Sequence, residues 1–246
     1  MSNEYSDFSC VYDKLIEDVD YEKLCKNLLE ACKKYSHKPH LVLDAACGTG
    51  NFTAELLKNG FDVIGVDFSP EMLAVAREKT DNKATLICQD LCELDLYGTI
   101  DTAFCMLDSL NHITDYDDFK KAIARISLFL EPEGLMIFDV NTVFKHEKIL
   151  SDNIFTQEKE NIYMIWENTL FEDDVVNINM DFFVRQSDGR YDRLNENFDE
   201  RAYSEEEISQ ALSAAGLEIL ETRDFFTNKN VTKTSEKVIY ITRKAN

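Results

Sequence analysis

Two glycines and two aspartates stand at the spacing of a nucleoside-binding turn. An apolar run reaches Asp44, and a Gly-x-Gly turn at Gly48 and Gly50 then leads into a helical stretch. Such a run is typical of a strand buried on both faces of a parallel sheet. Glycines let a ligand approach the backbone, and N–H groups at a helix start favour an electronegative group. A second apolar segment, 62–66, ends about 20 residues later in Asp67, where a carboxylate can accept hydrogen bonds from ribose hydroxyls.

The residue three positions after Gly50 helps to distinguish a dinucleotide cofactor from a nucleoside cofactor without phosphates. A dinucleotide-binding GxGxxG motif has a third glycine there, which accompanies pyrophosphate binding and close helix packing. This chain has Thr53 instead. The difference disfavours NAD and FAD and favours a nucleoside without phosphates, with an NAD-dependent oxidoreductase as the weaker alternative.

A second group of polar residues follows the expected fourth strand, 101–107. Asp108, Ser109, Asn111 and His112 crowd into one short stretch. The end of this strand is next to the topological switch of a doubly wound sheet, where such folds bind ligands. His112 with Asp108 could act as a general base. Alternatively, Asn111 and His112 only cap the next helix, and the reaction needs no more than proximity and the exclusion of water.

The elements that must position these residues alternate along the chain between strands and helices. Apolar runs end at turn residues, and apolar residues recur at helical spacing between them. The expected helices span 21–35, 51–59, 116–130 and 204–215, with another that begins at Pro70. The expected strands are the run before Asp44, then 62–66, 84–88, 101–107, 135–140, 217–226 and 236–243.

The hydrophobic period changes between 160 and 198. Apolar and polar residues alternate there, and turn residues stand at 172–174 and 187–189. This pattern predicts an antiparallel β-meander of about three strands. Its half-polar faces suit a lid or floor over an acceptor site, and a homodimer interface is the alternative.

The meander divides the chain into two parts. Residues 1–142 and 200–246 are expected to form the core, and 143–199 an inserted antiparallel β subdomain on the acceptor side. Aromatic residues of the insertion are candidates for an apolar acceptor pocket. They are Tyr163, Trp166, Phe171 and Phe183.

The composition argues against several classes of protein. The chain has 47 acidic and 26 basic residues and a formal net charge of −21, which disfavours a nucleic-acid partner. No apolar run approaches membrane-spanning length, and the N-terminus lacks the layout of a signal peptide. The cysteines number seven, without a CxxC pair or histidines at metal-ligand spacing. We therefore expect reduced thiols in the cytoplasm and no metal site.

At four segments the chain resembles the class I, Rossmann-like S-adenosylmethionine-dependent methyltransferases. The segments, in the family's order and spacing, are 42–50 (VLDAACGTG), 65–73 (GVDFSPEML), 88–91 (CQDL) and 131–139 (EPEGLMIFD). The resemblance covers 40–142 well and 200–243 loosely. It implies an α/β fold with a three-layer, doubly wound, mostly parallel seven-stranded sheet whose last strand is antiparallel.

The resemblance also implies S-adenosylmethionine as cofactor and a set of residues that bind it. Asp44 would orient the glycine turn or contact the methionine ammonium, and Asp67 would hold the ribose. Asp90 would accept from the adenine amino group, with the backbone of Leu91 beside the ring, and Tyr12 would lie in an arm over the cofactor. A strand-end turn residue and a surface arm are the alternatives for Asp90 and Tyr12. The other expected contacts are Ala46, Gly48, Gly50, Phe68, Met72, Gln89 and Leu107.

These features together predict a methyltransferase that acts on an unidentified small-molecule acceptor. The alternative is a protein without catalytic activity that has the same fold and serves as an S-adenosylmethionine-binding or assembly module. Amine, carboxylate, hydroxyl and thiol acceptors are all compatible with the residues at the strand ends.

Overall fold

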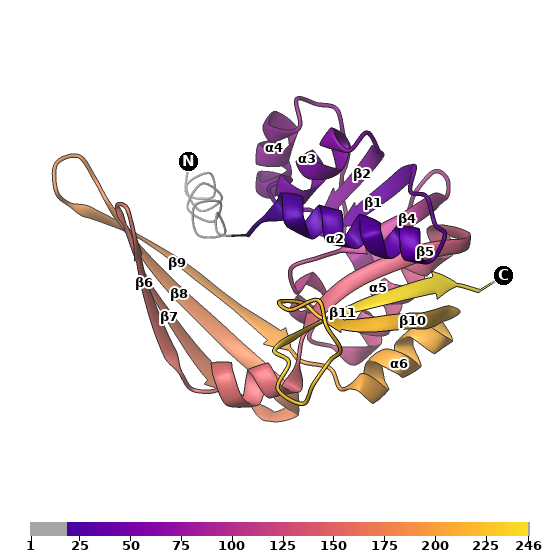
Figure 1. The fold of residues 1–246 in the computed structure, drawn as a ribbon. Helices are drawn as coiled ribbons and strands as arrows, with labels where there is room; N and C mark the ends of the chain where they lie inside the picture. Colours follow the sequence, from indigo (N-terminus) through magenta and orange to yellow (C-terminus); the bar gives the residue numbers. More distant parts are fainter. Residues whose placement is uncertain (1–18, 246) are drawn as a thin grey trace.

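The core of the protein is a seven-stranded, mostly parallel sheet. The computed structural model describes residues 19–245. The strands stand in the order β10-β11-β5-β4-β1-β2-β3 (Figure 1). β11 runs antiparallel to both of its neighbours, whereas the other adjacent pairs are parallel, as predicted. The bounds are β1 Leu41–Ala45, β2 Asp62–Asp67, β3 Thr85–Cys88, β4 Ile100–Cys105, β5 Leu130–Asn141, β10 Leu217–Asp224 and β11 Lys237–Lys244.

Of the five α-helices in the described chain, four begin at a capping side chain, and α3 begins at Gly50. Asp20, Ser69, Asp115 and Ser204 each accept a backbone N–H of the first turn that follows. Ser204 also completes the capping box with Glu207. The α-helices of the described chain are α2 Tyr21–Lys34, α3 Asn51–Lys58, α4 Pro70–Lys79, α5 Tyr116–Phe129 and α6 Glu205–Ala214.

Helices cover both faces of the sheet and complete three layers (Figure 1). One apolar cluster joins α2 and α3 to one face and includes Leu28 and Phe52. The other cluster joins α5 and α6 to the opposite face and includes Ile123 and Leu212. The strand order reverses between β1 and β4, so the loops after these two strands meet at the same edge. The predicted doubly wound class is confirmed.

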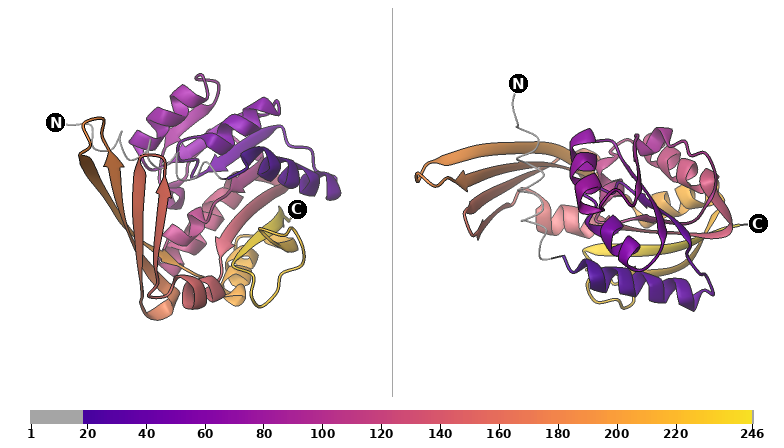
Figure 2. Two further views of the ribbon diagram at one scale, coloured as in Figure 1. Left: turned by 60° about the vertical axis from the view of Figure 1, so that its left-hand side comes forward. Right: turned by 90° about the horizontal axis from the view of Figure 1, so that it is seen from above.

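The alternating segment forms a second sheet with four antiparallel strands, in the order β6-β7-β8-β9. Their bounds are β6 Ile154–Lys159, β7 Ile162–Leu170, β8 Val175–Arg185 and β9 Tyr191–Arg201. The expectation of about three strands missed β6, because its sequence (IFTQEK) does not alternate apolar and polar residues. Both views of Figure 2 show this sheet extending away from one end of the core.

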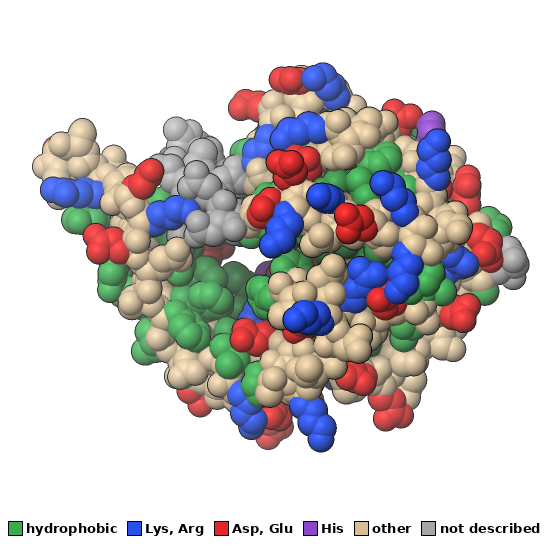
Figure 3. Space-filling model, viewed as in Figure 1, with side chains coloured by type: hydrophobic (Ala, Val, Ile, Leu, Met, Phe, Trp, Pro, Cys, Tyr) green, Lys and Arg blue, Asp and Glu red, His purple; other side chains and the backbone are tan. Residues whose placement is uncertain are grey.

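The second sheet has a mainly apolar inner face and an outer face with many more polar residues. Phe182, Ile178 and Trp166 share the face that also bears Glu200, since paired residues of neighbouring strands point the same way. Figure 3 shows a hollow between this sheet and the core, with hydrophobic side chains on the sheet's side of it. Trp166 lies on this inner face, whereas Tyr163 and Phe183 lie on the opposite, outer face.

The outer face carries a ladder of amide and carboxylate groups. Asn177 donates to Asn197 and Asp199, and Asn195 donates to Asn179. These polar groups suit contact with water, whereas the inner face suits contact with an apolar body. The two faces therefore differ in what they can cover.

Short helical segments connect the strands. They are η2 Leu91–Glu93, η3 Ser109–His112, the π-helical η4 Lys145–Leu150 and η5 Glu172–Asp174. η3 follows β4 and η4 follows β5, so both leave the edge where the ligand-binding loops meet. In residues 19–245, no helix has the length and apolar character needed to cross a membrane.

Candidate active site

The glycine turn after β1 has three residues in the left-handed region, Ala46 (φ 58°), Gly48 (φ 52°) and Gly50 (φ 78°). A Cβ added at Gly48 would meet no atom within 4 Å, so the space in front of this residue is open to a ligand. A Cβ added at Gly50 would lie 2.8 Å from Cβ of Ala76 on α4. A side chain is thus missing at the two positions for different reasons. Gly48 leaves room for a ligand in front of the turn, and Gly50 lets α4 pack against the turn.

Asp67 ties the end of β2 to this turn. Its Oδ2 accepts the N–H of Gly48 at 2.8 Å, and its Oδ1 accepts the N–H of Ser69 at 2.9 Å. Burial raises the pKa of Asp67, and the two N–H groups oppose that rise. Each carboxylate oxygen keeps a second lone pair, so the side chain can still accept from ribose hydroxyls.

Asp44 has a partner that the sequence argument did not assign. The hydroxyl of Thr53 donates to Asp44 Oδ2 at 2.5 Å, and both residues are buried. Burial raises the pKa of Asp44 to about 7, although the Thr53 hydroxyl lowers it. At the position where a dinucleotide-binding motif has its third glycine, this chain thus has a threonine. The Thr53 hydroxyl donates to the Asp44 carboxylate and holds it beside the glycine turn.

Phe68 and Met72 lie just beyond the end of β2. Phe68 is 77% exposed, which is unusual for a large aromatic ring beside a strand terminus. Met72 is half-buried at the start of α4, where its N–H donates to the Ser69 cap at 3.1 Å. An exposed ring at this edge is available to pack against a planar ligand.

The end of β3 lies beside the end of β2. The N–H of Gln89 donates to the Asp67 carbonyl at 3.0 Å. Asp90 caps η2 by accepting the N–H of Cys92 at 2.8 Å, and Leu91 behind it is buried. The turn role that was the alternative for Asp90 is thus present, and its exposed side chain keeps further lone pairs for a ligand.

The loop after β4 is held in an uncommon conformation by one carboxylate. Leu107 (φ 61°) and Asp108 (φ 55°) are consecutive left-handed residues that are not glycine. Asp139, on β5, accepts the N–H of Leu107 at 2.6 Å and the N–H of Asp108 at 2.9 Å. Backbone strain of this kind persists where the surroundings fix it, and such places are often functional. The sequence argument gave Asp139 no role of this kind.

Asp108, which is partly buried, forms an ion pair with a buried lysine. Lys237 Nζ, from β11, lies 3.3 Å from Asp108 Oδ2 and 3.5 Å from Asp139 Oδ2. Asn141 Nδ2 donates to the same Asp108 oxygen at 2.7 Å. Burial would raise the pKa of Asp108, but the charges of Lys237 and Lys145 outweigh it and hold that pKa below its usual range. A carboxylate fixed in this way is suited to position the loop.

His112 lies at the junction of the core and the second sheet. Its side chain is 45% exposed, and its Nε2 lies 3.8 Å from Oε1 of Glu200 on β9. Its ring packs against Phe198 at 5.0 Å between centroids. It is also near enough to Asp67 to lower the pKa of that carboxyl group. The carboxylate paired with His112 within 4 Å is therefore Glu200 rather than the expected Asp108.

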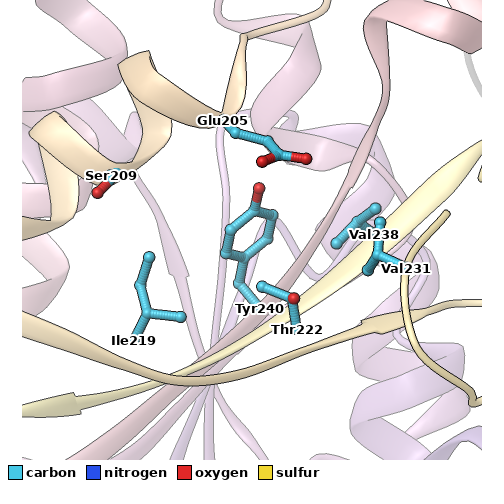
Figure 4. A pocket seen from close by; sticks show the side chains of 7 residues that line it. All are labelled: Glu205, Ser209, Ile219, Thr222, Val231, Val238 and Tyr240. Carbon is cyan, nitrogen blue, oxygen red and sulfur yellow. The ribbon is translucent and has the colours of Figure 1, made fainter. Parts of the chain in front are cut away.

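Two surface pockets lie away from these strand ends. One, of about 230 Å³, is formed by α6, β10 and β11, and Figure 4 shows the Glu205 carboxylate close to the Tyr240 hydroxyl there. The other, of about 300 Å³, is lined by residues of α2 and α3. Neither pocket includes a residue expected to bind the cofactor, and Tyr12 lies outside the described residues. The strand ends remain the place where the polar groups converge.

The chain is similar to known proteins along almost its whole length. A family model described as a methyltransferase domain matches residues 42–134. A putative methyltransferase from Geobacillus sp. (strain WCH70) is 33% identical over 245 residues, which cover 98% of this chain and 99% of the relative. The crystal structure of an S-adenosylmethionine-dependent methyltransferase from Clostridium acetobutylicum ATCC 824 is 38% identical, with a TM-score of 0.90 over 99% of this chain and 100% of the other.

The fold is also shared by a more distant enzyme. A structure of an amino pentose methyltransferase from Micromonospora echinaspora, with S-adenosylmethionine bound, is 18% identical, with a TM-score of 0.80 over 100% of this chain and 99% of the other. The full-length relatives set aside the NAD-dependent oxidoreductase and the non-catalytic module that the sequence left as alternatives. The chain belongs to the class I S-adenosylmethionine-dependent methyltransferases, and S-adenosylmethionine is its methyl donor.

Proposed function

We propose that this methyltransferase methylates an amine of a small-molecule acceptor that binds in the hollow between the core and the four-stranded sheet. The observation that carries this proposal is the position of His112. Its imidazole is half exposed, lies 3.8 Å from the Glu200 carboxylate, and is close enough to act electrostatically on Asp67. An imidazole backed by a carboxylate, between the cofactor side and the acceptor side, suits proton removal.

An aliphatic amine needs such a base before it can be methylated. S-Adenosylmethionine supplies an electrophilic methyl group, and the acceptor nitrogen must offer a lone pair in line with it. Alkyl ammonium groups titrate near pH 10, so at neutral pH the nitrogen mostly carries an extra proton. His112 would accept that proton. Asp108, expected as its partner, would instead position the β4 loop through Lys237.

The charge and shape of the hollow support a small cationic acceptor. Glu200 lies at its core end, and Glu196 shares the apolar inner face of the second sheet, whereas the charge of Asp108 is taken up by Lys237. Carboxylates in partly buried surroundings attract an ammonium group more strongly than carboxylates in water do. The net charge of −21 disfavours nucleic acid as acceptor. The apolar inner and polar outer faces favour a lid or floor over a homodimer interface as the role of residues 143–199.

The cofactor would lie along the ends of β1, β2 and β3. Gly48 leaves space for the methionine portion, beside Asp44 and the backbone of Ala46 and Gly50. Asp67 would accept from the ribose hydroxyls. The remaining expected contacts are Tyr12, Phe68, Met72, Gln89, Asp90, Leu91 and Leu107. The cysteines among residues 19–245 are free thiols, which is in keeping with the cytoplasmic location that we propose.

Turnover with matched acceptors tests the proposed function. The purified enzyme is mixed with S-adenosylmethionine and with an amino sugar, the parent sugar with a hydroxyl at that carbon, or a transfer RNA. Release of S-adenosylhomocysteine is measured. We expect turnover with the amine, and a loss of about 100-fold in His112→Gln with unchanged affinity for S-adenosylhomocysteine. Turnover with the hydroxyl compound or the RNA, but with no amine, would overturn the proposal.

A further inference from the structure

One carboxylate of the second sheet lies between two imidazoles. Glu200 is 5% exposed, and its Oε1 lies 3.8 Å from Nε2 of His112 on η3. Its Oε2 lies 3.8 Å from Nε2 of His146 on η4. Asn141 Nδ2, at the end of β5, donates to Oε2 at 2.9 Å. Segments that follow two core strands thus converge on one side chain of β9.

The second imidazole, His146, is buried and has one ring nitrogen on a backbone carbonyl. Its side chain is fully buried, and its Nδ1 lies 2.8 Å from the carbonyl oxygen of Asp174. A carbonyl oxygen only accepts, so Nδ1 must carry a hydrogen. Nε2 is also buried and has no hydrogen-bond partner. His146 Nε2 therefore approaches Oε2 of Glu200, at 3.8 Å, without a hydrogen bond to it.

The other nearby charges do not occupy Oε1 of Glu200. Lys145 Nζ donates to Asn141 Oδ1 at 2.9 Å, and Lys237 pairs with Asp108 at 3.3 Å. Asn141 and His146 both approach Oε2. Oε1 is therefore the oxygen left for His112.

We propose that Glu200 is the positioning residue of His112: Oε1 accepts the Nε2–H of the imidazole, and this leaves the lone pair on Nδ1 for the acceptor's proton. The source of that proton rests on the proposed function, whereas the tautomer is a property of the chain alone. The proton passes from the acceptor ammonium to Nδ1. The freed nitrogen lone pair then bonds to the methyl carbon, and the electrons of the carbon–sulfur bond go to sulfur. At 3.8 Å the contact is still longer than a hydrogen bond, and catalytic contacts of this kind tighten when ligands bind.

Glu200→Gln gives a sharp test of the tautomer. The Gln carbonyl oxygen would keep the hydrogen bond from Asn141, so its NH₂ group would face the imidazole. An N–H donor requires a lone pair on Nε2, and the hydrogen of His112 would then move to Nδ1. The chain has four histidines, so ¹⁵N-histidine NMR at alkaline pH gives few signals, and His112→Gln identifies the relevant pair. We expect an Nε2–H tautomer in the wild type and an Nδ1–H tautomer in the variant.

Kinetics give a second, independent readout. We expect Glu200→Gln to lower kcat by about 100-fold, with the KM for S-adenosylmethionine within about twofold. Adding His112→Gln should cause no further loss beyond that of His112→Gln alone. The control is Asp199→Asn, which makes the same charge change at the next residue on the outer face, where Asn177 donates to Asp199 at 2.7 Å. It should match the wild type.

The outcomes separate the two proposals. An unchanged His112 tautomer in Glu200→Gln, or losses that multiply in the double variant, would overturn the positioning role. A changed tautomer together with no turnover of any amine would refute the proposed function and leave the positioning role standing. A changed tautomer with the expected kinetics supports both.

Discussion

Replacing Lys237 with Met tests whether charge holds the loop after β4 in place. Lys237 is 7% exposed as a whole residue, and its ammonium nitrogen lies 3.3 Å from Asp108 and 3.5 Å from Asp139. Burial alone would lower the pKa of Lys237, but the two carboxylates outweigh burial and raise it. Met retains an unbranched apolar chain that can pack on the Phe225 ring, which now lies 5.0 Å from the ammonium. The substitution therefore removes mainly the charge.

The expected cost follows from the two carboxylates that remain. Removing one partner of a buried ion pair costs about 3–5 kcal/mol, because the other charge stays buried without compensation. In the wild type the Asp108 pKa is held below its usual range, so its stabilisation is present above about pH 4 and is lost as pH falls through the lower folded value. In the variant the attraction of Lys237 is lost, so the pKa of Asp108 rises, and that of Asp139, which burial already raises in the wild type, rises further. The destabilisation should therefore be largest at neutral pH and shrink on acidification.

Urea unfolding followed by far-ultraviolet circular dichroism measures this difference at pH 7 and pH 5. Adding Asp108→Asn to Lys237→Met should recover part of the lost stability, because it removes one uncompensated charge and Asn tolerates the left-handed conformation. A difference below about 1 kcal/mol at pH 7 would refute the reasoning. So would a loss of equal size at both pH values.

Three further predictions concern the cofactor side. Gly50→Ala should destabilise the fold by about 1–3 kcal/mol in thermal unfolding, since the added Cβ would lie 2.8 Å from Cβ of Ala76 on α4. Gly48→Ala should cost less stability but weaken the binding of S-adenosylhomocysteine, measured by calorimetry. Equal effects of the two substitutions on stability and on binding would contradict the division of roles between the two glycines. Thr53→Val should lower the free energy of unfolding by about 1–3 kcal/mol, because Asp44 loses its hydroxyl donor. The pKa of Asp44 is raised to about 7, so this loss of stability should grow as the pH rises through that value and the carboxylate becomes charged. A loss that does not depend on pH in urea unfolding would argue against the pairing of Thr53 with Asp44. Asp67→Ala should weaken S-adenosylhomocysteine binding by about 1–3 kcal/mol by calorimetry, and an unchanged affinity would remove its ribose role.

The sequence by itself determined the core of the molecule. Apolar runs, the glycine turn and capping residues such as Ser69 and Ser204 act within a few residues of one another, so they specify strands, turns and helix starts locally. The order of strands and helices then restricts the topology, because connections are short and crossovers right-handed. Asp67 and Gly48 could be placed at one edge on these grounds, and their 2.8 Å contact agrees.

Side-chain partners that come from distant parts of the chain needed the tertiary structure. Thr53 stood in the sequence as a departure from a motif, and only packing shows that it donates to Asp44. Glu200 carried no signal, because its register on β9 and the position of β9 beside η3 decide which imidazole it meets.

The charge balance at the strand ends was equally hidden from the sequence. Whether Asp108 serves as a base or as a fixed partner of Lys237 depends on burial and on the 3.3 Å distance between Lys237 Nζ, on β11, and Asp108 Oδ2, in the loop after β4. Local pattern fixes which face a residue occupies, but electrostatic roles depend on what the fold brings within a few ångströms in a medium of low dielectric constant. The sequence therefore predicted the strand ends at which we place the site, and the tertiary structure decided which side chains act on one another there.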